Sequence, residues 1–97
     1  MSLIVNISYT GKNASPKKFV DEMISEGIVE KIRVEEGNIR YEYFFSKDDP
    51  ETVLLIDCWK NKEALDAHHK TEMMKEIAIL REKYELKMKV EQYTNVL

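Results

Sequence analysis

Residues 56–74, IDCWKNKEALDAHHKTEMM, contain the end of one predicted strand, a turn and most of a predicted helix. The strand ends at Trp59, and Asn61 is a residue type that caps helix N-termini. A helix that begins there brings up His68 and His69. An indole and two imidazoles are therefore expected near one strand-to-helix junction, and this combination of apolar wall and titratable ring suits a small-molecule pocket.

Hydrophobic periodicity predicts the strands and helices on both sides of this junction. In the first strand, Leu3, Val5 and other odd-numbered residues share one face, with Asn6 on the other. Ser15 is the expected N-cap of the first helix, in which Gly27 is a weak point, and a kink is expected near Thr71 in the second helix. The predicted strands are 3–9, 39–46, 52–59 and 85–94, and the predicted helices are 16–34 and 61–84. This β-α-β-β-α-β order predicts an α+β, ferredoxin-like fold with an antiparallel four-stranded sheet.

Length and composition restrict the classes of protein to consider. A chain of 97 residues has room for one domain, residues 1–97. Its net charge is −3 with scattered basic residues, which argues against nucleic acid as a partner, and no apolar run approaches the ~20 residues that cross a bilayer. One cysteine and no signal-peptide pattern at the N-terminus predict a cytoplasmic protein.

The central strands predict a homodimer. An antiparallel sheet with helices on one face normally alternates apolar and polar residues, because its other face meets water. Residues 53–56, VLLI, do not alternate, and neither does the aromatic run within residues 41–45, YEYFF. Both faces of the sheet are therefore expected to be buried. The helices of so small a domain cover one face, so the other is expected to pack against a second copy of the chain.

Three segments, in this order, resemble the antibiotic biosynthesis monooxygenase family, a branch of the dimeric α+β barrel superfamily. They are residues 35–41 (EEGNIRY), 57–59 (DCW, with aspartate where glutamate is commoner) and 63–68 (EALDAH). The resemblance implies a dimeric α+β barrel and, often, an oxygenase that uses O2 without metal or flavin on phenols, hydroquinones or polycyclic aromatics. Some relatives instead degrade heme, and others rearrange small phosphorylated sugars without oxygen.

Three residues are the candidate catalytic set. His68 is the expected general base, since the ordinary pKa of histidine, about 6.5, is close to neutral pH. Trp59 is the expected flat wall for an aromatic substrate, and Asn6 is expected to hydrogen-bond a substrate oxygen. Heme-degrading relatives use an Asn, Trp and His set, which Asn6, Trp59 and either His68 or His69 resemble. The structural alternatives are a core tryptophan, a half-buried histidine and a polar residue at a sheet edge.

Asp57 lies two residues before Trp59 and therefore on the same strand face. It is expected to contact substrate or to orient a histidine or arginine. A structural ion pair with Arg40 or Lys60 is the alternative. Cys58 is expected on the opposite face as a small buried hydrophobe.

Tyr41, Tyr43 and His69 complete the predicted substrate-contacting residues, although the two tyrosines suit a dimer interface equally well. His68 is favoured over His69 for the pocket, because adjacent helical residues differ by about 100° around the axis. For a metal the chain offers only His68, His69 and Glu72, and a metal-free site is preferred.

The sequence therefore predicts a cofactor-independent monooxygenase that oxidises a small aromatic, phenolic or quinol substrate with O2. A heme-binding or heme-degrading protein is the alternative within the family. An oxygen-independent isomerase or lyase and a small-ligand binding module are alternatives of other classes. The expected partners are a small molecule and a second copy of the chain, with no nucleic acid or membrane.

Overall fold

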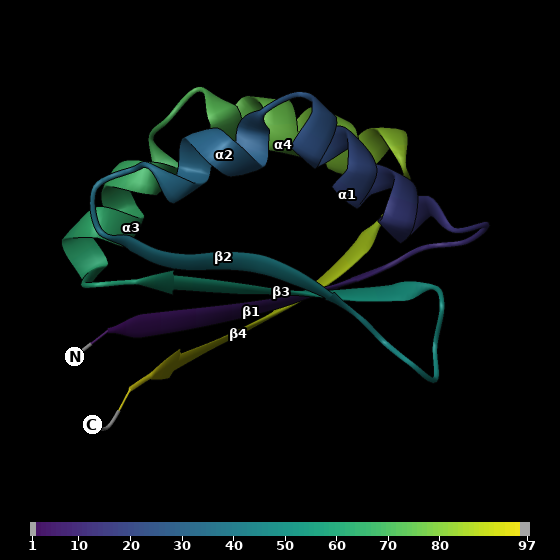
Figure 1. Cartoon of the computed structure of the whole chain (residues 1–97), viewed down its shortest axis with the longest axis horizontal. Coiled ribbons are helices and arrows are strands. Elements are labelled where there is room, and N and C mark those ends of the chain that lie inside the picture. The colour runs from purple at the N-terminus through teal and green to yellow at the C-terminus, as the bar shows by residue number, and fades with distance from the viewer. Residues whose placement is uncertain (1, 96–97) are drawn as a thin grey trace.

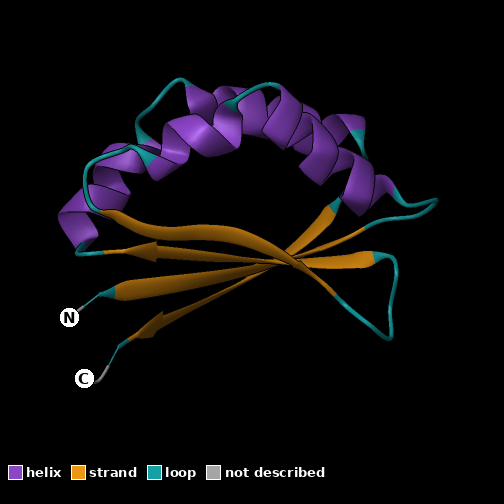
Figure 2. Ribbon diagram, viewed as in Figure 1, coloured by secondary structure: helices purple, strands orange, loops and turns teal. Residues whose placement is uncertain are grey.

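The computed structural model describes residues 2–95 and contains one antiparallel sheet covered by helices. Its elements, in chain order, are β1 (Leu3–Thr10), α1 (Ser15–Ser25), α2 (Ile28–Arg33), β2 (Asn38–Phe45), β3 (Thr52–Trp59), α3 (Lys62–His69), α4 (Met73–Lys83) and β4 (Lys87–Thr94). The strands are arranged β2-β3-β1-β4, with every neighbouring pair antiparallel. All the helices lie on one face (Figure 1; Figure 2). The predicted α+β, ferredoxin-like architecture is confirmed.

The core lies between the sheet and the helix layer. Alternation along β1 turns Val5 and Tyr9 toward the helices, where both are buried. The register places Val5 opposite Asp57 and Tyr9 opposite Val53, so the same face of β3 is buried. Helix residues complete this core: Phe19, Val20, Met23, Ile28, Val29, Ile32, Ala64, Leu65, Ile77 and Leu80. No helix in the described part of the chain is long and apolar enough to cross a membrane.

Each predicted helix is divided in two. Gly27 has a φ of 76°, and this left-handed conformation separates α1 from α2 at the predicted weak point. At the predicted kink, the Thr71 hydroxyl and amide both donate to the His68 carbonyl, at 2.9 and 3.1 Å, and so end α3. The division of each helix lets two short segments follow the twisted sheet where one straight helix would not.

Two predicted boundaries are wrong. Ser15 is the first residue of α1, while Ala14, with a φ of 61°, occupies the N-cap position and Ser15 Oγ has no hydrogen-bond partner. Left-handed turns of the backbone therefore begin this helix without a side-chain cap. The last strand begins at Lys87, because Glu85 adopts a φ of 51° and interrupts the extended backbone.

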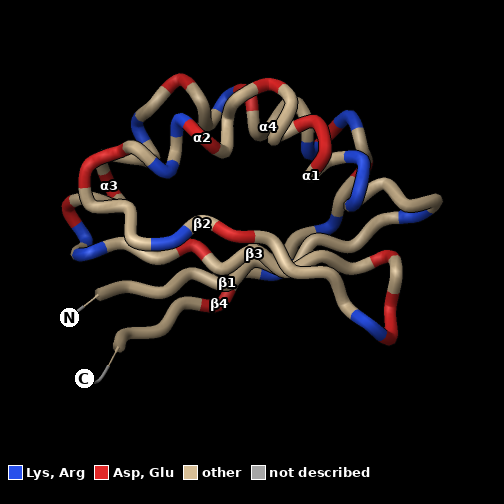
Figure 3. The backbone as a smooth tube through the Cα atoms, in the orientation of Figure 1, with Lys and Arg blue, Asp and Glu red and all other residues tan. Residues whose placement is uncertain are grey.

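The sheet face without helices is apolar at its centre. Leu54 and Ile56 lie half-buried on this face, and Cys58 is 8% exposed. Charged residues of both signs are interspersed over the helix layer, whereas the central strands carry few (Figure 3). The predicted absence of alternation in β3 thus corresponds to apolar residues on both faces of a central strand.

Candidate functional site

The site begins where β2 and β3 are paired. Asn38, the first residue of β2, lies opposite Trp59, the last residue of β3. The Lys60 amide donates to the Gly37 carbonyl at 2.8 Å and holds this end of the ladder closed. The segment that precedes β2, which contains Glu35, is therefore held beside the start of α3.

Helix α3 begins as the sequence predicts. The Asn61 side-chain oxygen accepts a hydrogen bond from the Ala64 amide at 2.9 Å, which is the expected N-cap. Ala64, Leu65 and His68 are buried on one side of this helix, and His69 is exposed. Desolvation and the neighbouring His68 lower the pKa of His69. The structure thus turns only His68 toward the sheet.

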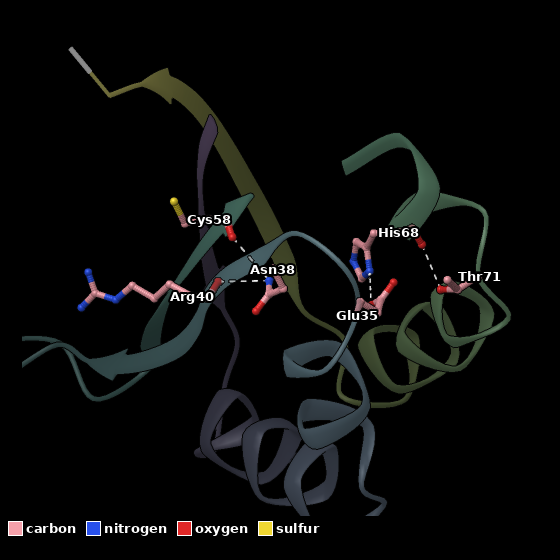
Figure 4. Close-up of polar contacts among 6 residues, drawn as sticks. All are labelled: Glu35, Asn38, Arg40, Cys58, His68 and Thr71. Atoms are coloured by element: carbon pink, nitrogen blue, oxygen red, sulfur yellow. Dashed lines mark hydrogen bonds and ion pairs between the residues drawn. The ribbon is translucent and has the colours of Figure 1, made fainter. Parts of the chain in front are cut away.

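His68 is held by a carboxylate. Its Nδ1 lies 2.7 Å from Glu35 Oε2 (Figure 4). The His68 side chain is 4% exposed and that of Glu35 17%, so bulk solvent screens the contact little. Because a carboxylate only accepts hydrogen bonds, it favours the proton on Nδ1 and leaves the lone pair on Nε2. Among the described residues, Nε2 has no hydrogen-bond partner.

Trp59 supports the imidazole from the sheet. The two rings are stacked, with their centroids 4.6 Å apart and their planes inclined by 29°. Trp59 is 0% exposed, and the stacked imidazole covers one face of its indole. The His69 ring is tilted at 5.7 Å from that of His68, on the outer side. The indole and one imidazole therefore meet at the junction, as predicted, in a closed arrangement.

Asp57 is a buried carboxyl without an ion-pair partner. Burial raises its pKa to about 6, while the Trp59 indole and the charge of His68 oppose the rise. The indole N–H approaches the carboxyl without reaching hydrogen-bond geometry, since Trp59 Nε1 and Asp57 Oδ1 are both buried without a partner. Ion pairing with Arg40 or Lys60, the predicted alternative, is wrong, because these cations pair elsewhere, with Glu42 and Glu36 respectively.

Tyr41 and Tyr43 face the helices from β2. Tyr41 lies opposite Asp57 and is 3% exposed. The two hydroxyls are 3.3 Å apart, and the rings meet edge to face at 5.7 Å. Burial raises the pKa of both tyrosines, so their hydroxyls stay protonated at neutral pH. Of the two expected environments, Tyr41 and Tyr43 occupy the interior between the sheet and the helices and not the helix-free face of the sheet.

The structure does not bring Asn6 together with Trp59 and His68. Strand alternation places Asn6 on the helix-free face, opposite Ile56. Asn6 Oδ1 is buried there without a hydrogen-bond partner. Within the chain, the sheet itself separates this amide from the His68 imidazole.

Glu35 is a site residue that the sequence analysis did not single out. It lies in the segment between α2 and β2, and only strand pairing brings it to His68. A signal was present in the sequence, because Glu35 stands two residues before Gly37 in the EEGN segment. Gly37 has a φ of 86°, and a Cβ there would lie 2.5 Å from the Ala64 Cβ. The close approach of these backbones is what sets Glu35 against His68.

Gly37→Ala is expected to destabilise the protein more than Gly27→Ala does. Both glycines have positive φ, so each substitution costs about 1–2 kcal/mol of backbone strain. A Cβ at Gly27 meets nothing within 4 Å, whereas one at Gly37 collides with Ala64 and adds about 1–3 kcal/mol. Urea unfolding of both variants measures the difference. Equal losses of the free energy of unfolding would contradict the close packing described at Gly37.

Glu72, the third predicted metal-ligand candidate, is exposed, and its Oε2 atom lies 3.4 Å from Lys75 Nζ. Within residues 2–95, no group of three or more His, Cys, Asp or Glu side chains is arranged to hold a metal ion.

The family model for antibiotic biosynthesis monooxygenases matches residues 2–78 of the chain. No curated protein matches this chain. The chain is similar in fold to several solved structures. A candidate antibiotic biosynthesis monooxygenase from Deinococcus radiodurans is 14% identical with a TM-score of 0.85, covering 98% of this chain and 93% of its own.

SnoaB from Streptomyces nogalater, a cofactor-independent oxygenase, has a TM-score of 0.82 at 12% identity, covering 99% of this chain and 94% of its own. A candidate antibiotic biosynthesis monooxygenase from Nitrosomonas europaea has a TM-score of 0.78 at 22% identity. The match covers 97% of this chain and 99% of the Nitrosomonas chain. At these identities the structural likeness establishes the fold alone.

Proposed function

The chain belongs to the antibiotic biosynthesis monooxygenase family, and from this premise we propose that it is a cofactor-independent monooxygenase of small phenolic or quinol substrates. The observation that carries the proposal is the hydrogen bond of His68 Nδ1 to Glu35 beside the stacked Trp59 ring. It gives the chain a buried base with a defined tautomer. The description of SnoaB as a cofactor-independent oxygenase supports the same class of reaction.

In the proposed reaction, His68 Nε2 removes a proton from the substrate. Glu35 stabilises the resulting imidazolium, because the charge-assisted hydrogen bond at Nδ1 strengthens when the ring becomes positive. The stacked indole adds a favourable interaction between a cation and an aromatic face. Both contacts therefore favour the state in which His68 has accepted the proton, as a general base requires.

The substrate anion supplies the electrons. It passes one electron to O2, and the two radicals combine to form a carbon–peroxide bond. The O–O bond then breaks, one oxygen stays on the substrate carbon as a carbonyl, and the other leaves as water with two protons taken from the substrate. In the keto tautomer of the phenol or quinol the reacting ring carbon is a CH2, and its oxidation to a carbonyl supplies the four electrons that this reduction of O2 consumes. Burial of Trp59 and His68 keeps solvent away from these intermediates.

Oxygen uptake tests the proposal. Purified protein treated with chelator is assayed with hydroquinones, naphthols and anthrones under air. We expect uptake that is proportional to protein and unchanged by the chelator, with a product that carries one atom of labelled oxygen from ¹⁸O2. Uptake that requires added heme, or turnover that is equal under nitrogen, would replace the proposal with heme degradation or with an oxygen-independent reaction. No consumption of any substrate would refute it.

Glu35→Ala is expected to lower kcat by about 10- to 100-fold, the equivalent of one charge-assisted hydrogen bond. Glu35→Gln retains an oxygen that accepts a hydrogen bond from Nδ1, so its kcat is expected to fall less than that of Glu35→Ala. The ¹⁵N chemical shifts of His68 in labelled protein report the tautomer independently of activity. We expect one Nδ1-protonated form in the wild type and a mixture in Glu35→Ala. An unchanged tautomer in that variant would show that Glu35 does not position the ring.

The helix-free sheet face is the proposed homodimer interface. Leu54 and Ile56 give it an apolar centre that the single chain leaves half-buried. The unpartnered Oδ1 of Asn6 lies on the same face and would find a donor across such an interface. Sedimentation equilibrium measures the mass directly, with 11.4 kDa for one chain. A mass of one chain at micromolar concentration would rule the dimer out.

A further inference from the structure

A cavity of about 640 Å³ lies at the end of the sheet away from His68. Its walls come from the turn between β1 and α1, from the residue before β3 and from the segment that joins α4 to β4. This end of the molecule is opposite to α3 (Figure 1). Strand β3 runs from Thr52 here to Trp59 at the other end, a span of about 23 Å for a strand of this length. The cavity is therefore separate from the junction that holds Trp59 and His68.

Hydrogen bonds between segments far apart in the chain hold the walls of this cavity. The Asn13 amide donates to the Glu51 carboxylate at 3.2 Å and ties the turn after β1 to the start of β3. On the other side, Lys83 and the Tyr84 hydroxyl both donate to Glu22 Oε1, at 2.7 and 2.5 Å. These two contacts tie the end of α4 to α1. The cavity is therefore formed by the folded chain itself, as ligand sites usually are.

The backbone around the cavity adopts unusual conformations. Within residues 2–95, all the non-glycine residues with positive φ lie at the cavity or beside it. Asn13 and Glu85 line it, with φ of 56° and 51°, and Ala14 follows Asn13 with a φ of 61°. Left-handed backbone is unfavourable for residues with a Cβ, and it persists where the surrounding structure requires it, often at binding sites. Here it turns two segments around the cavity.

The cavity gathers positive charge. Its lining contains four lysines from different segments of the chain: Lys12, Lys18, Lys83 and Lys87. Lys83 is paired with Glu22, whereas the other three form no ion pair in the described part of the chain. The lining also contains Glu51 and Glu85, so its formal charge is +2 in a chain whose net charge is −3. An anion is the ligand that such a cavity attracts.

The chemistry of lysine narrows the kind of anion. All four cations of the lining are ammonium groups, which are point charges without the planar fork by which arginine matches a carboxylate. A phosphate group presents its oxygens in several directions, so ammonium groups from different segments contact it together. It also carries about two negative charges at neutral pH. The volume lies within the range of about 300–1,000 Å³ for small-molecule sites, which leaves room for more than the phosphate group alone.

We propose that this cavity binds a small organic phosphate, whose phosphate group is held by Lys12, Lys18 and Lys87. Lys83 keeps its contact with Glu22 and fixes the wall between α1 and α4. The ligand differs in charge from the proposed phenolic substrate and occupies the opposite end of the sheet. The two sites are therefore independent in position and in chemistry, and this one stands or falls without reference to oxygenation.

An NMR titration of the ¹⁵N-labelled whole chain tests the site. Glycerol phosphate, inorganic phosphate and neutral glycerol are compared at constant ionic strength. With glycerol phosphate we expect saturable shifts of the Gly11, Lys12 and Glu85 amide resonances, with those of Trp59 and His68 unmoved. Inorganic phosphate is expected to bind more weakly, and glycerol not at all. Affinity for glycerol phosphate is expected to fall below about pH 6, where a phosphate ester takes up its second proton.

Two double variants separate the cavity from the general charge of the protein. Lys18→Gln combined with Lys87→Gln removes two lining lysines, one from α1 and one from β4. Lys17→Gln combined with Lys89→Gln removes the same charge from the same two elements outside the lining. All four side chains are exposed, and urea unfolding establishes that both variants are folded. We expect the first variant to bind glycerol phosphate about tenfold more weakly, as the loss of two exposed ion pairs predicts, and the second to change by less than about twofold.

Three results would overturn the proposal. Equal losses of affinity in the two double variants would mean that only the overall charge attracts the ligand. Equal affinities of the wild type for glycerol phosphate and inorganic phosphate would mean an adventitious ion only. The absence of saturable shifts with glycerol phosphate would mean that the lysines of this cavity are simply solvated.

Discussion

His68→Gln is expected to lower kcat by about 10²- to 10⁴-fold, the usual contribution of a general base. Glutamine retains polar atoms and approximate volume, but it has no lone pair of comparable basicity at the position of Nε2. Glu35 and Trp59 then contact a side chain that does not accept the substrate proton. Steady-state oxygen uptake over a range of substrate concentrations measures kcat and KM separately. Far-UV circular dichroism and urea unfolding establish that the variant is folded.

The adjacent histidine provides the control. His69 is exposed, and its ring lies 5.7 Å from that of His68 on the side away from Trp59. His69→Gln is therefore expected to keep kcat within about threefold of the wild-type value. A change of that size corresponds to less than the 1.4 kcal/mol of a tenfold effect. Comparable losses in the two variants would contradict the assignment of the base to His68. A His68→Gln variant with full activity would do the same.

Asp57→Asn is expected to change how stability depends on pH. The folded state holds the Asp57 pKa at about 6, above the ordinary value of 3.8, mainly because the carboxyl is buried. Between these values the folded protein retains a proton that the unfolded chain releases, so the wild type loses stability as pH rises from about 4 to about 6. The difference of pKa corresponds to about 3 kcal/mol at neutral pH. Asparagine does not titrate and is free of this loss.

Urea unfolding at pH 4 and pH 7.5 measures the effect. We expect the free energy of unfolding of Asp57→Asn, relative to the wild type, to rise by about 2–3 kcal/mol between these pH values. Asp66→Asn is the control, because the hydrogen bond from Lys62 holds the pKa of Asp66 below its ordinary value. The free energy of unfolding of Asp66→Asn, relative to the wild type, is expected to fall slightly between the same two pH values. A pH-independent difference for Asp57→Asn would mean that this carboxyl titrates normally in the folded protein.

The sequence predicted the fold because the decisive features are local. Alternation in β1, the Asn61 cap and the break at Gly27 each depend on a few consecutive residues. The two boundaries that differ, at Ser15 and Lys87, follow left-handed residues that are not glycine. Residues such as Ala14 and Glu85 adopt this conformation rarely, so their identity gives no signal of it.

The site was predicted less completely because its geometry depends on strand register. Alternation assigned Asn6 to the opposite face from Val5, but only the pairing of Val5 with Asp57 decides which of them shares the face of Trp59. Glu35 approaches His68 only after β2 and β3 pair and the backbone closes at Gly37. Contacts of this kind join residues far apart in the chain, and no local pattern encodes their distance.

Strand β4 pairs with β1 along its whole length, yet each of its eight residues is exposed. Its detachment therefore exposes little new apolar surface and costs less free energy than the opening of the buried strand β3. Amide hydrogens of β4 are accordingly the first in the sheet to exchange with solvent. Each such opening bares the edge of β1, onto which the β4 of another copy fits in the same register. The fold thus contains a route to strand exchange between molecules.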